Sequence, residues 1–288
     1  MQEQIREYLL WKSQHSPHTL KPYMLWLNRF KDYVRKTELQ EINRKDIVDF
    51  SIHIKNKYSE RTHEFAMAIL HGFFKFWHEE DNRVLSPNLV VVPSYRRKIM
   101  PVITEEIFKK LLDALPIYEY ISLQRHIILR MLWESGCRIS ELLSIDLPNI
   151  NFEKCCAVIE TRKTSVRRRI FWSEATNELL IKKYMPIRRE VKRDSHALFI
   201  GFYNSGEYSN RLNPRQVQRT IENLRTELCI SEKITPHSFR HGKAHFMLEH
   251  GASVVDIQQI LGHVSPNSSF AYLQYQGTEL ERRAKKFL

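Results

Sequence analysis

Hydrophobic residues recur with a helical period through the first ninety residues of the chain. The spacing of three or four positions is seen first in Leu20, Tyr23, Leu27, Phe30 and Val34, and again, after Ser59, in Phe65, Ile69, Phe73 and Phe76. Residues three or four positions apart share one face of a helix, and serine commonly precedes the first helical turn. We therefore predict a module of four helices, near residues 2–13, 19–36, 43–56 and 60–81.

The pattern changes after this module. Residues 86–101 contain three prolines and little periodicity, so we predict a linker at 89–101 between a first domain at 1–88 and a second at 102–288. Thr104 is placed to cap the first helix of the second domain. Further on, AVIETRKTSVRRRIFW has two β-rich runs around a basic turn, which is typical of a β-hairpin. The predicted fold is mainly α-helical with a small β-sheet.

The net charge of the chain indicates what kind of partner it binds. Among 288 residues, 45 are Lys or Arg and 33 are Asp or Glu, which gives a net charge of +12. Such an excess indicates a polyanionic partner, and double-stranded DNA is the simplest choice. Neutralising phosphates releases counterions, so binding is expected to weaken steeply with salt.

Other features restrict the class of protein. The four cysteines, Cys137, Cys155, Cys156 and Cys229, form no C-x-x-C pair and no zinc spacing, so reduced thiols are expected. The first ten residues lack an apolar signal core, and no apolar run approaches the ~20 residues of a membrane span. We expect a cytoplasmic protein associated with the nucleoid.

The strongest chemical signal lies in the last fifty residues. Thr235-Pro236 is typical of a helix start, so His237, Arg240 and His241 are predicted to share one helical face. Guanidinium can donate two parallel hydrogen bonds to phosphate, and imidazole can move a proton near neutral pH. The next helix is predicted to end at Gly262, which places His263 in the following turn, and Tyr272 lies about two turns into another helix after Ser265-Pro266.

A tyrosine in this setting is a candidate nucleophile for a phosphodiester. Its hydroxyl has an unperturbed pKa of ~10, so attack on phosphorus needs nearby cations and a proton acceptor. The arginine and histidines supply both. Two alternative interpretations stay open. Phe270, Tyr272 and Tyr275 could form an aromatic stripe in the core, or Tyr275 could be the nucleophile in place of Tyr272.

The strings HSFRH and ILGH, with a tyrosine nine residues after the second motif's histidine, resemble the tyrosine recombinase (phage integrase) family. SGCRISELLSI resembles its first arginine motif and provides Arg138, with Glu141 as a supporting residue. The family carries a catalytic lysine in the hairpin, and Lys163 matches it best. Both the Xer type and mobile-element integrases fit this resemblance.

The resemblance implies a mechanism and an architecture. Tyr272 attacks a DNA phosphodiester and forms a 3′-phosphotyrosyl link, while two arginines, Arg138 and Arg240, hold the non-bridging oxygens. Lys163 protonates the leaving 5′-oxygen. His237 accepts the tyrosine proton and His263 contacts a phosphate oxygen, with His241 in support. The helical core-binding domain and the catalytic domain are expected to close around DNA as a C-shaped clamp, without metal or any other cofactor.

Further expectations concern contacts. DNA contacts are expected from the basic residues of the linker and hairpin, namely Arg96, Arg97, Arg162, Arg167, Arg168 and Arg169. After Tyr272 the tail is either a frayed amphipathic segment or a helix that docks on a neighbour within a homo-tetramer on two DNA sites. Accessory proteins are possible partners.

Three rival functions remain open. A type IB topoisomerase uses nearly the same chemical groups, and a non-catalytic DNA-binding regulator would explain the charge and the helices. A metal-dependent hydrolase is disfavoured because His63-Glu64 has Met67 where an H-E-x-x-H motif needs its second histidine.

Overall fold

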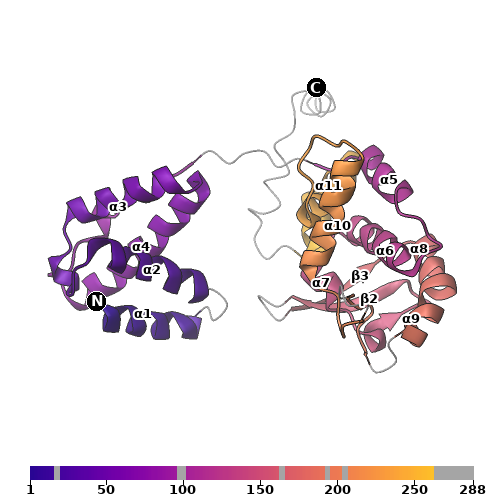
Figure 1. Cartoon of the computed structure of the whole chain (residues 1–288), viewed down its shortest axis with the longest axis horizontal. Coiled ribbons are helices and arrows are strands. Elements are labelled where there is room, and N and C mark those ends of the chain that lie inside the picture. The colour runs from indigo at the N-terminus through magenta and orange to yellow at the C-terminus, as the bar shows by residue number, and fades with distance from the viewer. Residues whose placement is uncertain (16–19, 96–101, 162–165, 192–194, 203–206, 263–288) are drawn as a thin grey trace. The chain divides into compact units, whose positions relative to one another are not determined.

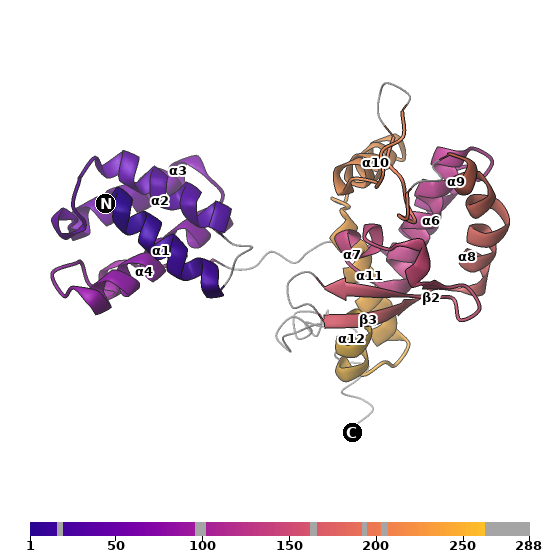
Figure 2. The ribbon, with the colours of Figure 1, turned by 90° about the horizontal axis from the view of Figure 1, so that it is seen from below.

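A computed structural model of the chain describes residues 1–15, 20–95, 102–161, 166–191, 195–202 and 207–262. The chain divides into two compact units, Met1–Lys98 and Ile99–Leu288, which are described separately (Figure 1). Helices predominate in both, and one small antiparallel sheet lies in the second unit (Figure 2). The predicted fold class, mainly α with a small sheet, is confirmed.

The first unit consists of four helices with two short 3₁₀ turns, which lie at α1 (Gln2–His15), α2 (Leu20–Val34), η2 (Leu39–Glu41), α3 (Arg44–Lys57), α4 (Glu60–Glu80) and η3 (Pro87–Leu89). The four predicted helices are confirmed, with ends within two residues of those expected. Side chains fix two helix starts. Asn43 accepts from the backbone N–H groups of Lys45 and Asp46, and the Ser59 hydroxyl accepts from Thr62.

Aromatic residues fill the core of this unit. Phe30 meets Phe50 and Phe74 edge to face, at ring-centroid distances of 5.1 and 5.9 Å. The packing continues past α4, because Val90 is 2% exposed within the same core. The Tyr95 hydroxyl lies 2.6 Å from Nδ1 of His63. The chain therefore stays attached to the first unit up to Tyr95.

The second unit surrounds a three-stranded antiparallel sheet with helices. Its elements are α5 (Glu105–Asp113), α6 (Tyr120–Ser135), α7 (Ile139–Leu143), η4 (Leu147–Asn149), β1 (Ile150–Asn151), β2 (Cys156–Thr161), β3 (Val166–Phe171), α8 (Glu174–Glu178), η5 (Leu179–Tyr184), α9 (Met185–Val191), α10 (Pro214–Glu227), α11 (Pro236–Glu249) and α12 (Val254–Leu261). The sheet order is β1-β2-β3. The predicted hairpin is formed by β2 and β3, and the Thr104 hydroxyl caps α5 by accepting from Ile107.

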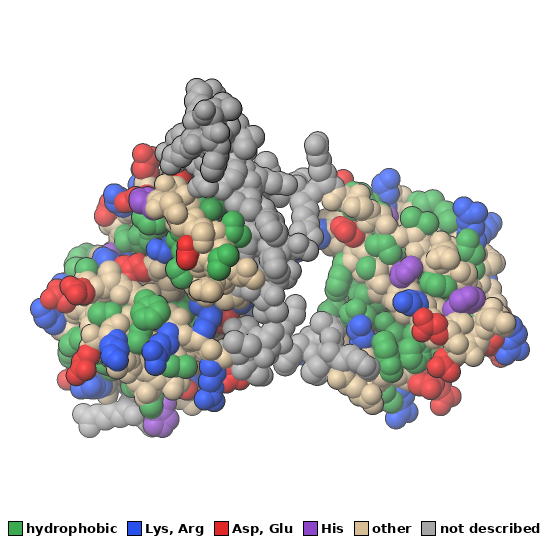
Figure 3. All heavy atoms as spheres, turned by 180° about the vertical axis from the view of Figure 1, so that it is seen from behind, with side chains coloured by type: hydrophobic (Ala, Val, Ile, Leu, Met, Phe, Trp, Pro, Cys, Tyr) green, Lys and Arg blue, Asp and Glu red, His purple; other side chains and the backbone are tan. Residues whose placement is uncertain are grey.

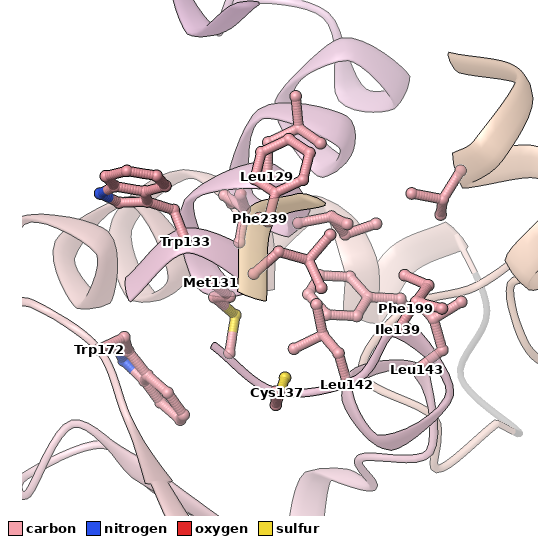
Figure 4. Packing of buried hydrophobic residues seen from close by; sticks show 14 of the residues in the cluster. Leu129, Met131, Trp133, Cys137, Ile139, Leu142, Leu143, Trp172, Phe199 and Phe239 are labelled. Atoms are coloured by element: carbon pink, nitrogen blue, oxygen red, sulfur yellow. The ribbon is translucent and has the colours of Figure 1, made fainter. Parts of the chain in front are cut away.

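Helix α6 is the centre of the second core. Its residues Leu129, Met131 and Trp133 pack with Leu142 of α7 and Phe239 of α11 (Figure 4). Helix α11 approaches α6 closely because it carries glycine at position 242, where a Cβ atom would lie 2.6 Å from the Trp133 ring. The core thereby brings two segments that are a hundred residues apart into contact.

Figure 3 shows basic and acidic side chains interspersed over the visible face of each unit. Within the described residues, no helix is long and apolar enough to cross a membrane.

Candidate active site

Arg138 is placed by the sharp end of α6. Gly136 ends that helix with a φ of +59°, a conformation that glycine adopts without a Cβ penalty. Arg138 then precedes α7, where its backbone N–H donates to Oε2 of Glu141 at 2.9 Å and its Nη1 donates to Oε1 at 2.8 Å. Glu141 is 3% exposed, whereas the Arg138 side chain is 34% exposed. The carboxylate therefore orients a guanidinium that can still reach a ligand from solvent.

Arg240 enters the same site from α11. It is buried, and its Nη1 donates to the backbone carbonyl of Gly136 at 2.9 Å. The residue that turns the chain toward Arg138 thus also anchors Arg240. The sequence predicts that the segment of Arg138 meets the helix that carries Arg240, and the structure brings these two together.

His237 and His241 lie on the same side of α11 as Arg240. Desolvation by the surrounding protein, with the charges of Arg240 and Arg138, lowers the pKa of His237. His237 is nevertheless an exposed residue. Burial first, then the neighbouring His237 and Arg240, lowers the pKa of His241 to about 4. Both imidazoles are therefore neutral near pH 7, the state in which a ring nitrogen can accept a proton.

The half-buried His241 should make folding sensitive to acid. The unfolded chain protonates His241 near its ordinary pKa of 6.5, but the folded chain does so only near 4, so acid favours the unfolded state. We expect the free energy of unfolding to be unaffected by this residue above pH 6.5 and to fall between pH 6.5 and 4. The full difference between the two pKa values corresponds to about 3 kcal/mol and is reached only below pH 4, whereas about 2 kcal/mol is lost by pH 5. Urea unfolding at pH 7.5 and pH 5 measures the loss.

His241→Gln should reduce this acid-induced loss, although His237, His245 and His126 also have lowered pKa values and will retain part of it. His196→Gln is the matched control, because His196 is exposed in the same unit. A His241→Gln protein that loses as much stability at pH 5 as the wild type contradicts the assignment.

The hairpin arginines divide between the two faces of the sheet. Arg167 and Arg169 are exposed, and Arg167 lies 3.4 Å from the carboxylate of Glu160 on β2. Arg168 alternates to the other face, which it shares with the buried Ile170. This differs from the expectation that Arg168 contacts DNA, because its guanidinium is occupied within the protein.

Arg168 contacts two elements. Its Nη2 donates to Oε2 of Glu141 and its Nη1 to the carbonyl of Ile260 in α12, both at 2.9 Å. Burial alone would raise the pKa of Glu141, but the Arg138 backbone hydrogen bond and the charges of Arg168 and Arg138 outweigh it, so that this pKa is lowered. Glu141 is thus a carboxylate held between two arginines.

The end of α12 agrees with the sequence prediction. Ser253 caps the start of the helix by accepting from Asp256, and Gly262 ends it with a φ of +67°. Several predicted site residues follow this point or fall elsewhere outside the described residues, namely Arg96, Arg97, Arg162, Lys163, His263 and Tyr272. Their roles stay predictions, as does that of the C-terminal tail.

Two parts of the site were missed in the sequence. The hydrogen bond from Arg240 to the carbonyl of Gly136 could not be predicted from the sequence, because every residue has a backbone carbonyl. The inward direction of Arg168 did have one: in VRRRIFW, it is separated by two positions from Ile170 and by four from Trp172. Alternation along a strand places all three on one face.

The cysteines and possible metal ligands add little to this site. Burial raises the pKa of Cys137 to about 11, so this residue next to Arg138 stays a neutral thiol. All four cysteines are free. In the described part of the chain, no group of three or more His, Cys, Asp or Glu side chains could hold a metal ion.

Comparison with known proteins accounts for both units. The family model described as "Phage integrase family" matches residues 101–278, and "Phage integrase, N-terminal SAM-like domain" matches residues 3–81. The tyrosine recombinase XerC of Myxococcus xanthus is 25% identical over 293 residues, which cover 97% of this chain and 94% of the relative. The tyrosine recombinase XerC of Thermodesulfovibrio yellowstonii is 29% identical over 266 residues, covering 89% and 85%.

Solved structures share the fold. A crystal structure of the XerH site-specific recombinase, bound to a palindromic difH substrate in a post-cleavage complex, has a TM-score of 0.75. It is 19% identical in sequence and covers 92% of this chain and 78% of that chain. The likeness extends over both units of the chain.

Proposed function

The chain belongs to the phage integrase family, and from this premise we propose that it is a site-specific recombinase which cleaves and rejoins DNA strands through a 3′-phosphotyrosyl intermediate. The observation that carries this proposal is the convergence of Arg138 and Arg240: Glu141 holds Arg138, and Arg240 donates to the carbonyl of Gly136, two residues before Arg138, one helical turn from His237 on α11. Two cations beside a neutral imidazole suit an anionic phosphorus centre and a proton transfer. Integration, excision or resolution of DNA would all use this chemistry.

The arginines act on the phosphate. Negative charge grows on the non-bridging oxygens as the nucleophile attacks, and donors fixed before the reaction stabilise that charge without reorganising. Arg240 is fixed by the Gly136 carbonyl and Arg138 by Glu141. In each contact the guanidinium donates from Nη1, and its planar fork fixes the directions of its other donors as well.

The proton steps involve His237, Tyr272 and Lys163. His237 accepts the Tyr272 proton, which its lowered pKa favours because the ring is neutral at pH 7. Tyr272 forms the new bond to phosphorus while the bond to the 5′-oxygen breaks, and Lys163 gives that oxygen a proton. His263 donates a hydrogen bond to a phosphate oxygen, and His241 supports His237.

The two units would divide the work on DNA. Residues 1–88 act as the core-binding domain, together with the first part of the predicted 89–101 linker, which packs on them up to Tyr95. Residues 102–288 act as the catalytic domain, and the two domains close around duplex DNA as a C-shaped clamp. The net charge of +12 supports this partner. We place the protein in the cytoplasm with the nucleoid, as a homo-tetramer on two DNA sites whose tail helices couple neighbouring protomers.

The rival functions are less well supported. A non-catalytic regulator does not need a buried guanidinium beside two histidines of lowered pKa, and the relatives that match almost the whole chain are recombinases. A type IB topoisomerase would share the chemistry, but would relax supercoils without joining two sites.

Covalent trapping tests the proposed function directly. Wild-type protein is incubated, in buffer with EDTA, with a pool of duplexes nicked next to candidate sites, so that the short cleaved strand diffuses away and the phosphotyrosyl link persists. We expect a protein–DNA adduct that survives denaturing electrophoresis and whose sequencing gives the site. Binding of DNA without any adduct across a pool of suspected element ends and resolution sites would contradict the proposal.

A further inference from the structure

One guanidinium outside the expected catalytic set connects three parts of the site. Arg168 lies on β3 and is 11% exposed, and it donates both to Glu141 of α7 and to the Ile260 carbonyl near the end of α12. Since Glu141 also binds Arg138 through both of its oxygens, the three residues form a continuous ionic chain. Figure 2 shows β3 and α12 next to one another in the second unit.

Strand register explains why this arginine alone faces inward. In the ladder between β2 and β3, Arg168 stands opposite the buried Ile159, whereas Arg169 stands opposite the exposed Val158. A register shift of one residue would turn Arg168 to solvent. Its inward position is therefore maintained by the whole β2-β3 ladder and by Ile170 in the core.

The contact with α12 is equally specific. The last carbonyls of a helix lack partners within the helix, and a cation there also interacts favourably with the helix dipole. Arg168 meets both needs at Ile260. Its Nε and Cδ lie against Gly262, where a Cβ atom would be 2.6 and 2.7 Å away. Glycine at 262 is thus favoured by its φ of +67°, and a Cβ atom there would displace the Arg168 side chain.

We propose that Arg168 is a positioning residue for strand cleavage, which acts through Glu141 on Arg138 and fixes β3 against the end of α12. The inference rests on the proposed function. The order of residues in the sequence supports it: β3 begins three residues after Lys163, and Gly262 directly precedes His263. One side chain therefore links α7, β3 and the end of α12, the described elements that lie next to Arg138, Lys163 and His263 in the sequence.

The geometry requires arginine at this position. Nη1 and Nη2 address different acceptors, and only the planar fork of guanidinium presents two donors in fixed directions. A lysine ammonium would keep the charge but could satisfy only one of the two acceptors in this way. Without the cation, the buried Glu141 would lose one of the two guanidinium groups that donate to it, and the orientation of Arg138 would loosen.

The test separates cleavage from DNA binding. Arg168→Met and Arg168→Lys are compared with wild type in single-turnover adduct formation at saturating nicked duplex, and DNA affinity is titrated separately. We expect both variants to form adduct 10- to 100-fold more slowly, since a small misplacement of catalytic groups costs up to about 10²-fold. Affinity should stay within about twofold. Arg189→Met, an exposed arginine of α9, is the control and should match wild type.

A mutant cycle tests the route through Glu141. If Arg168 acts through this carboxylate, Arg168→Met combined with Glu141→Gln should be barely slower than Glu141→Gln alone. Multiplicative rate losses in the double variant overturn the proposal, as does an Arg168→Met protein that cleaves at the wild-type rate or loses only affinity. Thermal unfolding checks that each protein is folded, and Arg168→Lys provides the rate measurement if Arg168→Met does not fold. Absence of adduct with wild type would instead refute the proposed function.

Discussion

Tyr272→Phe should abolish the covalent protein–DNA adduct while leaving DNA affinity almost unchanged. Phenylalanine keeps the ring but has no hydroxyl, so no phosphotyrosyl bond can form whatever the arrangement of the cations. Affinity depends mainly on phosphate contacts from basic residues spread over the chain, which this substitution does not remove. Adduct is measured on a denaturing gel and affinity by titration at fixed salt.

Tyr275→Phe is the matched control, because it removes the same atom from the rival nucleophile three residues away. This variant should retain the adduct. An adduct with Tyr272→Phe that disappears with Tyr275→Phe would reassign the nucleophile, whereas an adduct with both single variants would require a nucleophile elsewhere in the chain.

Helices of the first unit were predictable because local signals agreed with one another. The apolar spacing of Phe65, Ile69 and Phe73 and the Ser59 cap both indicate the helix that the structure shows at Glu60–Glu80. Local signals also predicted the start of α11, from Thr235-Pro236, and the end of α12, at Gly262. Signals of this kind lie within a few neighbouring residues, so one sequence is enough to identify them.

Other parts of the fold depend on distant contacts and had no such signal. The helical run from Glu174 to Val191 contains a π-helical segment, η5, whose six residues carry no motif that distinguishes them from ordinary helix. Arg188 in the same run is buried and donates to the carbonyls of Ser195 and Ala197. A sequence presents it as one more surface cation, because its acceptors are supplied by the backbone after the fold is formed.

Within the site, residue types were easier to identify than their orientations. Motif spacing selected Arg138, His237 and Arg240, which the structure brings together. Composition alone makes the hairpin arginines one basic group, although alternation along β3 separates Arg168 from its neighbours. Net charge therefore indicated the kind of partner. The alternation of side chains along β3 determines which arginine binds within the protein and which ones are exposed to a partner.

Arg240→Lys should slow adduct formation by 10²- to 10³-fold at saturating DNA. Lysine retains the charge, but its ammonium cannot donate to the Gly136 carbonyl and to a phosphate with the fixed geometry of guanidinium. Loss of one fixed donor to a developing oxyanion typically costs about 3–4 kcal/mol, and each 1.36 kcal/mol is a factor of ten in rate. Single-turnover trapping provides the rate.

A change in the phosphate clamp has to be separated from a change in the fold, because Arg240 is only 4% exposed. Thermal unfolding of Arg240→Lys should show a folded protein at the assay temperature, and the same exchange at the exposed Arg189 should leave the rate unaltered. A folded Arg240→Lys protein that forms adduct within about threefold of the wild-type rate would mean that Arg240 holds the helix α11 in place but does not stabilise the transition state, since the predicted loss is far larger.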